Sequence, residues 1–423
     1  MPSSHAAGAP PATVDALALE DSAHHWRHPQ GVALRTVMAI AIAFAVFQMY
    51  TAAYSPLASQ VLRSLHVGFL LLLAFALFPP RRAGAGVHIP WYDWALGGVG
   101  FVLAFYHWVF ESDLIVRAGD PTTADLVVGT VVVALVFEAA RRVMGPALPV
   151  ICALFLGYGL FGQWLPGGLA HRGYGYDQII GALYLGTEGV YGIPVLISAT
   201  YIFLFILFGA FLEQAGMSKL FTDVAMGLVG RTRGGVAKVS VVSSALMGTI
   251  NGSGVANVVT TGQFTIPLMK RSGYKPAFAG AVEATASMGG QILPPVMGAV
   301  AFIMAETLDI PYLEVVKAAS IPALLYFATV MWIVHREAGR LGLRGLSAAL
   351  CPNAWQAVRA RGYLLLPLVA LVYLILSGYT PLYAGIAALI FTALLILGSA
   401  IAPRLGALGW RILFWVALGA AGG

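Results

Sequence analysis

Two interruptions in apolar sequence decide how this chain folds. They read Gly248-Thr249-Ile250-Asn251-Gly252-Ser253-Gly254-Val255-Ala256-Asn257 and Ser287-Met288-Gly289-Gly290-Gln291-Ile292-Leu293-Pro294-Pro295. In hydrocarbon each unsatisfied backbone polar group costs several kcal/mol, so irregular backbone persists only where protein or a water-filled cavity covers it. Two such breaks in the stretch 239–295 therefore predict a small polar site near the midplane of a bilayer.

The composition predicts an all-α polytopic membrane protein. Of 423 residues, 59% are hydrophobic and only 10% are charged, whereas soluble domains carry about 25% charged residues. The net charge of +6 does not indicate nucleic-acid binding, because Lys and Arg cluster in short loops between apolar runs. The two cysteines, Cys152 and Cys351, have no metal-site spacing, and no catalytic constellation is present. We therefore expect neither an enzyme nor a cofactor.

Charge sets the expected topology. We predict apolar spans at 32–53, 64–79, 91–110, 124–140, 147–165, 193–212, 236–269, 277–305, 318–334, 362–379, 381–401 and 408–421. Basic residues at Arg27, Arg35, Arg81-Arg82 and Arg141-Arg142 assign the N-terminus to the cytoplasm. Residues 1–30 are expected to form a disordered cytoplasmic tail without a signal peptide.

The same charges predict that the first break is the tip of a hairpin. Arg231, Arg233 and Lys238 precede the segment 239–269, and Lys270 and Arg271 follow it. Because both ends are basic, both are expected on the cytoplasmic side, so the segment must turn back inside the membrane. This is a re-entrant helical hairpin.

Three shorter features are expected at the membrane interface. Residues 171–192 are predicted to form a short amphipathic helix on the outer side, and residues 345–361 one on the cytoplasmic side. His107 and Trp108, near the end of a span, are typical of an interfacial belt.

The chemistry of the first break suits a small cation and a carboxylate. Gly252 and Gly254 permit backbone conformations that expose carbonyl oxygens, and Asn251, Ser253 and Asn257 add side-chain oxygens. A helix that starts after the turn, near 257–261, would point partial positive charge at an anionic substrate.

The second break follows the same logic. Pro294 and Pro295 lack backbone donors and are expected to open the helix, while Gly289 and Gly290 permit close approach to the hairpin tip. The alternative is that these glycines and prolines serve helix packing alone.

Glu283 lies inside an apolar span, where a carboxylate is a functional candidate by default. Two interpretations stay open. Glu283 relays protons, or it forms hydrogen bonds to Ser or Thr neighbours that hold the structure.

The motif Gly252-Ser253-Gly254-Val255-Ala256-Asn257-Val258-Val259-Thr260-Thr261-Gly262, followed by Phe264 to Arg271, closely resembles the large membrane subunit of TRAP transporters. So do Phe278 to Ala284 and Gly289 to Gly298. These sequence motifs are most similar to those of fused permeases that work with TAXI-type solute-binding proteins. Residues 31–143 then look like the four-helix small subunit, and residues 144–423 like the transport region.

The resemblance implies sodium-coupled uptake of organic acids, such as dicarboxylates or glutamate, by an elevator-type symporter in the bacterial inner membrane. Its partners would be a periplasmic binding protein and the lipid bilayer. It further implies a sodium site at Asn251, Ser253, Gly254, Asn257, Gly289, Gly290, Ile292 and Pro294. The implied substrate site consists of Ser253, Asn257, Thr260, Gln291 and Pro295. Asn251 and Asn257 stand where many relatives have Ser and Asp.

Large subunits of this family resemble inverted repeats, and only the first repeat and the start of a second are recognisable here. We therefore expect a truncated permease, or a second polypeptide that carries the missing repeat. Two alternatives stay open. One is a non-transporting assembly or regulatory subunit, and the other is a channel, since re-entrant loops also build selectivity filters.

Overall fold

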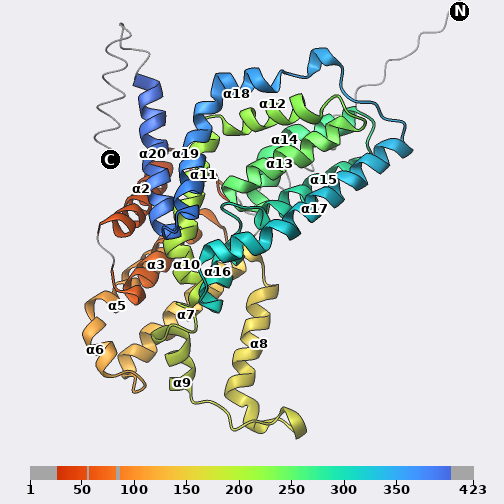
Figure 1. The fold of residues 1–423 in the computed structure, drawn as a ribbon. Helices are drawn as coiled ribbons and strands as arrows, with labels where there is room; N and C mark the ends of the chain where they lie inside the picture. Colours follow the sequence, from red (N-terminus) through yellow and green to blue (C-terminus); the bar gives the residue numbers. More distant parts are fainter. Residues whose placement is uncertain (1–25, 55–56, 82–85, 402–423) are drawn as a thin grey trace, which may run out of the picture. The chain divides into compact units, whose positions relative to one another are not determined.

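The computed structural model describes residues 26–54, 57–81 and 86–401, and every regular element in these ranges is helical (Figure 1). Within them, eight helices are long and apolar enough to cross a membrane. They span Gly31–Ala53, Ser59–Leu77, Thr123–Met144, Ala147–Trp164, Ile193–Gln214, Tyr312–Arg340, Ala348–Leu376 and Pro381–Ser399. The predicted all-α membrane fold is confirmed. The predicted span at 408–421 lies outside the described residues.

Residue contacts divide the chain into two units: Met1–Phe47 with Leu57–Leu196, and Gln48–Pro56 with Ile197–Gly423. The first unit holds most of α2 (Gly31–Ala53), then α3 (Ser59–Leu77), α4 (Trp91–Ala104), α5 (Tyr106–Val109), α6 (Glu111–Val116), α7 (Thr123–Met144), α8 (Ala147–Phe161), α9 (Tyr176–Ile180) and most of α10 (Ile193–Ile197). The subunit boundary that the resemblance implies, at residues 143 and 144, stays a prediction.

Small residues let α3 and α4 pack closely in the first unit. A Cβ added to Gly68 would lie 2.6 Å from the Cβ of Ala104, and one added to Gly97 would lie 3.1 Å from the Cα of Leu72. Close approach at small residues is a usual way for membrane helices to associate, because lipid provides no hydrophobic drive between them.

The prediction of one continuous span at 91–110 is wrong. The hydroxyl of Ser64 donates to the carbonyl oxygen of Ala104 at 2.6 Å, and the amide of Trp108 bonds Phe105 instead of Ala104. The side chain thus takes the acceptor that a continuous helix would use, and α4 ends at Ala104. A second break at Phe110 separates α5 from α6. His107 is 2% exposed, with its ring against Tyr184 and Tyr191, so the belt interpretation is wrong for this residue.

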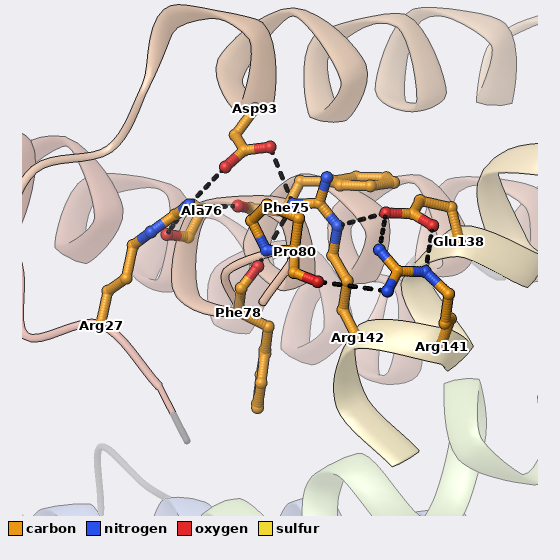
Figure 2. A network of polar contacts seen from close by, with 9 residues as sticks. All are labelled: Arg27, Phe75, Ala76, Phe78, Pro80, Asp93, Glu138, Arg141 and Arg142. Carbon is orange, nitrogen blue, oxygen red and sulfur yellow. Dashed lines mark hydrogen bonds and ion pairs between the residues drawn. The ribbon is translucent and has the colours of Figure 1, made fainter. Parts of the chain in front are cut away.

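Figure 2 shows a buried charge network that joins several segments of the first unit. Asp93 of α4 accepts from Arg27 at 2.5 Å and from Arg142 of α7 at 2.7 Å, and these side chains are at most 3% exposed. Glu138 is shared between Arg141 and Arg142, at 2.7 Å from each. Arg27 belongs to the predicted tail, yet its guanidinium also donates to the last carbonyls of α3. Arg27 and Arg142 therefore hold the fold together.

The second unit contains the hairpin and the broken helix. Its elements are α11 (Phe203–Gln214), α12 (Met217–Val229), α13 (Gly235–Asn251), α14 (Gly254–Arg271), α15 (Pro276–Gly289), α16 (Ala299–Leu308), α17 (Tyr312–Arg340), α18 (Ala354–Arg361), α19 (Leu365–Leu376) and α20 (Pro381–Ile401). Figure 1 shows α13, α14 and α15 side by side, with α17 along α15. Buried residues of these helices form one apolar core around Val241, Met269, Val282 and Val334.

Helix α12 was not expected from the sequence. Its buried residues are Met217, Leu220, Phe221 and Ala225, a spacing typical of an amphipathic helix. Lys219 and Asp223 interrupt the apolar run, so its hydropathy does not predict a membrane span. The other short elements are closer to expectation: α9 and a π-helical turn at Gly181–Leu185 lie within 171–192, and α18 lies within 345–361.

Candidate functional site

The first break is a tight turn between two helices. Helix α13 ends at Asn251, and Gly252 follows in the left-handed conformation with φ 59°, which favours glycine. Ser253 caps the next helix, since its hydroxyl accepts from the amide of Ala256 at 3.3 Å. Helix α14 starts at Gly254, three residues before the predicted start, because Ser253 supplies the cap. The predicted helical hairpin is present, with its tip at Gly252 and Ser253.

The second break begins before its two prolines. Helix α15 ends at Gly289, one 3-10 turn follows at Gly290–Ile292, and α16 resumes at Ala299. The prediction that Pro294 and Pro295 open the helix is therefore wrong in position, because the regular helix has already ended five residues earlier. The amide of Gly298 donates to the carbonyl of Gln291 at 2.7 Å, which closes the loop on itself.

The two breaks lie against each other. A Cβ added to Gly290 would lie 2.6 Å from the Cα of Gly248, and one added to Gly298 would lie 3.1 Å from the carbonyl oxygen of Gly252. A Cβ added to Gly254 would lie 3.0 Å from Nε2 of Gln291. These glycines allow backbone to meet backbone, so polar main-chain atoms from both breaks gather in one place.

Glu283 is fully buried beside the contact between the two breaks. Its carboxylate accepts hydrogen bonds from five hydroxyl groups. They come from three helices: Ser240 and Ser244 of α13, Thr261 and Thr265 of α14, and Ser287 of its own helix α15. Ser240 lies 2.6 Å from Oε2 and Ser244 lies 2.8 Å from Oε1. A carboxylate has about four lone-pair sites, so these donors saturate it. The Glu283 carboxylate therefore connects both hairpin helices to α15.

Asn257 connects the Glu283 cluster to the tip. It is fully buried, its Nδ2 donates to the carbonyl of Ser244 at 2.7 Å, and its main-chain carbonyl oxygen lies 2.8 Å from the hydroxyl oxygen of Thr261. The same Nδ2 lies 3.4 Å from the position of a Cβ built on Gly290. Asn257 of α14 therefore links the two helices of the hairpin through its hydrogen bond to α13.

The remaining predicted site residues divide between the tip and its surroundings. Thr260 points to α11, where its hydroxyl donates to Glu213 at 2.9 Å. Gln291 is at the tip contact, and the hydroxyl of Tyr312 donates to the carbonyl of Pro295 at 3.0 Å. Gly289 packs against Tyr326 and Phe327 of α17, and Ile292 and Pro294 belong to the loop of the second break. The binding roles assigned to all of these residues stay predictions.

One polar atom at the tip has no partner. Nδ2 of Asn251 is buried without a hydrogen bond in the structure, while Oδ1 of the same side chain accepts from the amide of Ser253 at 3.3 Å. A buried amide that lacks an acceptor is costly. The Asn251 amide at the turn therefore has a free donor.

None of the five donors to Glu283 was named in the sequence analysis. The signal was present as spacing: Ser240 and Ser244, Thr261 and Thr265, and Glu283 and Ser287 are each four residues apart. Residues at i and i+4 share one helix face. A hydroxyl stripe on each hairpin helix, opposite an intramembrane carboxylate, would have indicated the cluster.

Comparison with known protein families adds an independent observation. The family model described as "Tripartite ATP-independent periplasmic transporter, DctM component" matches residues 131–411. The chain belongs to this family. Members of the DctM family are multi-pass inner-membrane transporters, not enzymes, and they normally work with a periplasmic solute-binding protein.

Individual DctM relatives match a shorter part. The chain is 28% identical over 182 residues to the 2,3-diketo-L-gulonate TRAP transporter large permease protein YiaN of Escherichia coli, covering 43% of this chain and 42% of the relative. It is 29% identical over 190 residues to the C4-dicarboxylate TRAP transporter large permease protein DctM of Pseudomonas aeruginosa, covering 45% and 44%. The chain therefore spans less than half the length of these two curated relatives.

A third relative matches a short stretch. The isethionate TRAP transporter permease protein DctMQ of Oleidesulfovibrio alaskensis is 34% identical over 91 residues, which cover 22% of this chain and 14% of the relative.

Proposed function

We propose that this DctM-family chain is the membrane permease component of a sodium-coupled, binding-protein-dependent transporter that imports organic acids. The observation that carries the proposal is the contact between the hairpin tip and the broken helix. Main-chain carbonyls from both breaks are hard oxygen ligands, which suit a small cation such as sodium. The glycine contacts at Gly248 and Gly290 bring the main chains of the two breaks together.

The hydrogen-bond donors at the hairpin tip suit an anionic substrate. Helix α14 starts at the tip, so its free amides and its dipole direct partial positive charge there. The unpartnered Nδ2 of Asn251 adds a donor. The named substrates of the three relatives, 2,3-diketo-L-gulonate, C4-dicarboxylates and isethionate, are all organic acids.

The partner would be a TAXI-type binding protein, as the sequence motifs imply, with the N-terminus of the permease on the cytoplasmic side. Helices α2 to α6 precede the matched region 131–411, and α7 overlaps its start. Residues 31–143, which contain α2 to α7 up to Val143, would supply the small-subunit-like part of the proposed fused permease.

The test is uptake into proteoliposomes that contain the complete permease, with its binding protein and an organic acid outside. An inward sodium gradient is imposed, then replaced by an equal potassium gradient. We expect uptake only with sodium. Accumulation that ignores the sodium gradient would rule out the coupling mechanism.

A pair of variants assigns the site. Asn251→Ala removes the amide at the tip, and Asn353→Ala removes one from the cap of α18. Losing one hydrogen bond at the site is expected to raise the half-saturating concentration of sodium or substrate about tenfold. Asn353→Ala should leave both constants unchanged. Equal behaviour of the two variants would remove Asn251 from the site.

A further inference from the structure

A positively charged cleft lies away from the two breaks, between the C-terminal part of α17 and the start of the hairpin. Its volume is about 750 Å³, and Arg233, Phe278, Trp332, Arg336, Glu337 and Arg340 line it. Three guanidinium groups and one carboxylate face the cleft, which leaves an excess of two positive charges when His335 is neutral.

Among the described residues, the single carboxylate in the cleft pairs with only one of its three guanidinium groups. Arg340 is held by Glu337 through two hydrogen bonds of 2.8 and 2.7 Å. Arg233 and Arg336 form no ion pair with any residue in the described ranges. Nearby, Nζ of Lys238 lies 3.1 Å from Nδ1 of His335, so the surroundings add further positive charge. The complementary ligand is an anion with several acceptor oxygens, such as a phosphate.

Arg233 has a defined position in this cleft. A Cβ added to Gly339 of α17 would lie 2.8 Å from Cζ of Arg233. The guanidinium therefore rests on the bare backbone of a glycine. Because Arg233 comes two residues before α13, the cleft joins the base of the hairpin to α17.

An apolar surface continues from the cleft along α17. Trp332 is 64% exposed, and exposed Leu325 and Ile321 follow on the same helix face. From Ile321 to Trp332 the helix rises about 16 Å, comparable with one leaflet of a hydrocarbon core of about 30 Å. The surface thus offers the length of one acyl chain directly beside the anion cleft.

We infer that this cleft binds the headgroup of an anionic phospholipid, with its phosphate at Arg233 and Arg336 and an acyl chain along the exposed face of α17. Basic pockets between membrane helices suit such headgroups, because charge and apolar area act together. This lipid site is separate from the proposed transport site. It joins the start of α13 to the C-terminal part of α17.

Trp332 supplies a direct probe. The complete permease is reconstituted in vesicles of zwitterionic lipid with increasing fractions of a bromine-labelled phospholipid, either anionic or zwitterionic. Bromine quenches tryptophan fluorescence on contact, and the difference between the wild type and Trp332→Phe isolates the signal of this residue. We expect the anionic lipid to quench at a much lower mole fraction than the zwitterionic lipid.

Three variants separate the contributions. Arg233→Gln combined with Arg336→Gln should weaken the apparent affinity for the anionic lipid about thirtyfold, since each basic residue near an anionic surface contributes about 1 kcal/mol. Gly339→Leu keeps both charges but displaces Arg233, so it should weaken binding in the same direction. Lys317→Gln, an exposed cation at the other end of α17, should change nothing.

Two outcomes would overturn the inference. Equal quenching by both lipids in the wild type would mean that the cleft does not select anionic headgroups. Loss of the anionic-lipid signal on addition of millimolar inorganic phosphate, at constant ionic strength, would identify a free anion as the ligand. The Gly339→Leu variant keeps the inference testable if the double arginine variant does not fold.

Discussion

Gly248 of α13 and Gly290, just after α15, meet backbone to backbone: a Cβ on Gly290 would lie 2.6 Å from the Cα of Gly248. Neither position has room for a side chain, because the neighbouring atom is main chain and cannot rotate away. This contact joins the two sequence breaks, which are far apart along the chain, into one site.

Replacing Gly248 by alanine should therefore disrupt transport. The added methyl would force the tip away from the second break, and overpacking of this kind costs about 1–3 kcal/mol. We expect uptake by the reconstituted permease to fall to background and its thermal unfolding midpoint to drop. The matched control is Gly280→Ala on α15, where a Cβ meets open space. If both variants transported equally well, the close contact would have no functional importance.

Removing the charge of Glu283 should destabilise the hairpin. Glutamine keeps the shape but offers one acceptor oxygen where five hydroxyls now donate, and hydrogen bonds to charged groups contribute about 1.5–3 kcal/mol. We expect Glu283→Gln to lower the free energy of unfolding by about 2–3 kcal/mol, measured by denaturant titration in detergent. Glu314→Gln, at an exposed ion pair with Lys317, should change it by less than about 1 kcal/mol.

The same variant separates the two interpretations of Glu283. If the group only holds the hairpin, uptake by Glu283→Gln should be weaker but keep the pH profile of the wild type. If it relays protons, the profile itself should flatten. We expect the first result, because hydroxyls of the surrounding helices already occupy the lone pairs of the carboxylate.

The sequence could predict the hairpin and the meeting of the two breaks for a physical reason. Irregular backbone inside a membrane needs covering, and two such breaks cover each other most simply. It could not predict where each helix ends, because single side chains decide this. Ser253 moved the start of α14 to Gly254, and Ser64 took the carbonyl that would have continued α4 past Ala104.

Burial of charge was the other feature that the sequence could not give. Arginines near span ends favour an assignment to exposed loops, yet Arg27 and Arg142 are buried around Asp93. The pairing depends on which helices are neighbours in the folded chain, and no local pattern contains that information. Asp93 itself follows Trp91 and Tyr92 and falls inside the predicted span 91–110.

Asp93→Asn should destabilise the first unit severely. The change leaves the buried guanidinium groups of Arg27 and Arg142 without their shared carboxylate (Figure 2), and breaking a buried ion pair costs about 3–5 kcal/mol. We expect rapid cleavage within residues 57–196 under limited proteolysis. Asp113→Asn removes an exposed carboxylate from α6 and should digest like the wild type. Equal resistance of the two variants would show that the network does not stabilise this unit.

Gly254→Val tests whether the tip acts in transport or only in packing. A Cβ at Gly254 would lie 3.0 Å from Nε2 of Gln291 and 3.1 Å from the Cα of Met288, so the branched side chain of valine would push the tip away from the second break. The flanking helices keep their apolar surfaces, so membrane insertion should persist. We expect wild-type amounts of protein in the membrane fraction and no sodium-dependent uptake. Val255→Ile, at the exposed neighbouring position, should transport normally. Wild-type uptake by Gly254→Val would mean that the contact at the tip serves packing alone, because a bulky side chain there would then disturb neither the proposed cation ligands nor the start of α14.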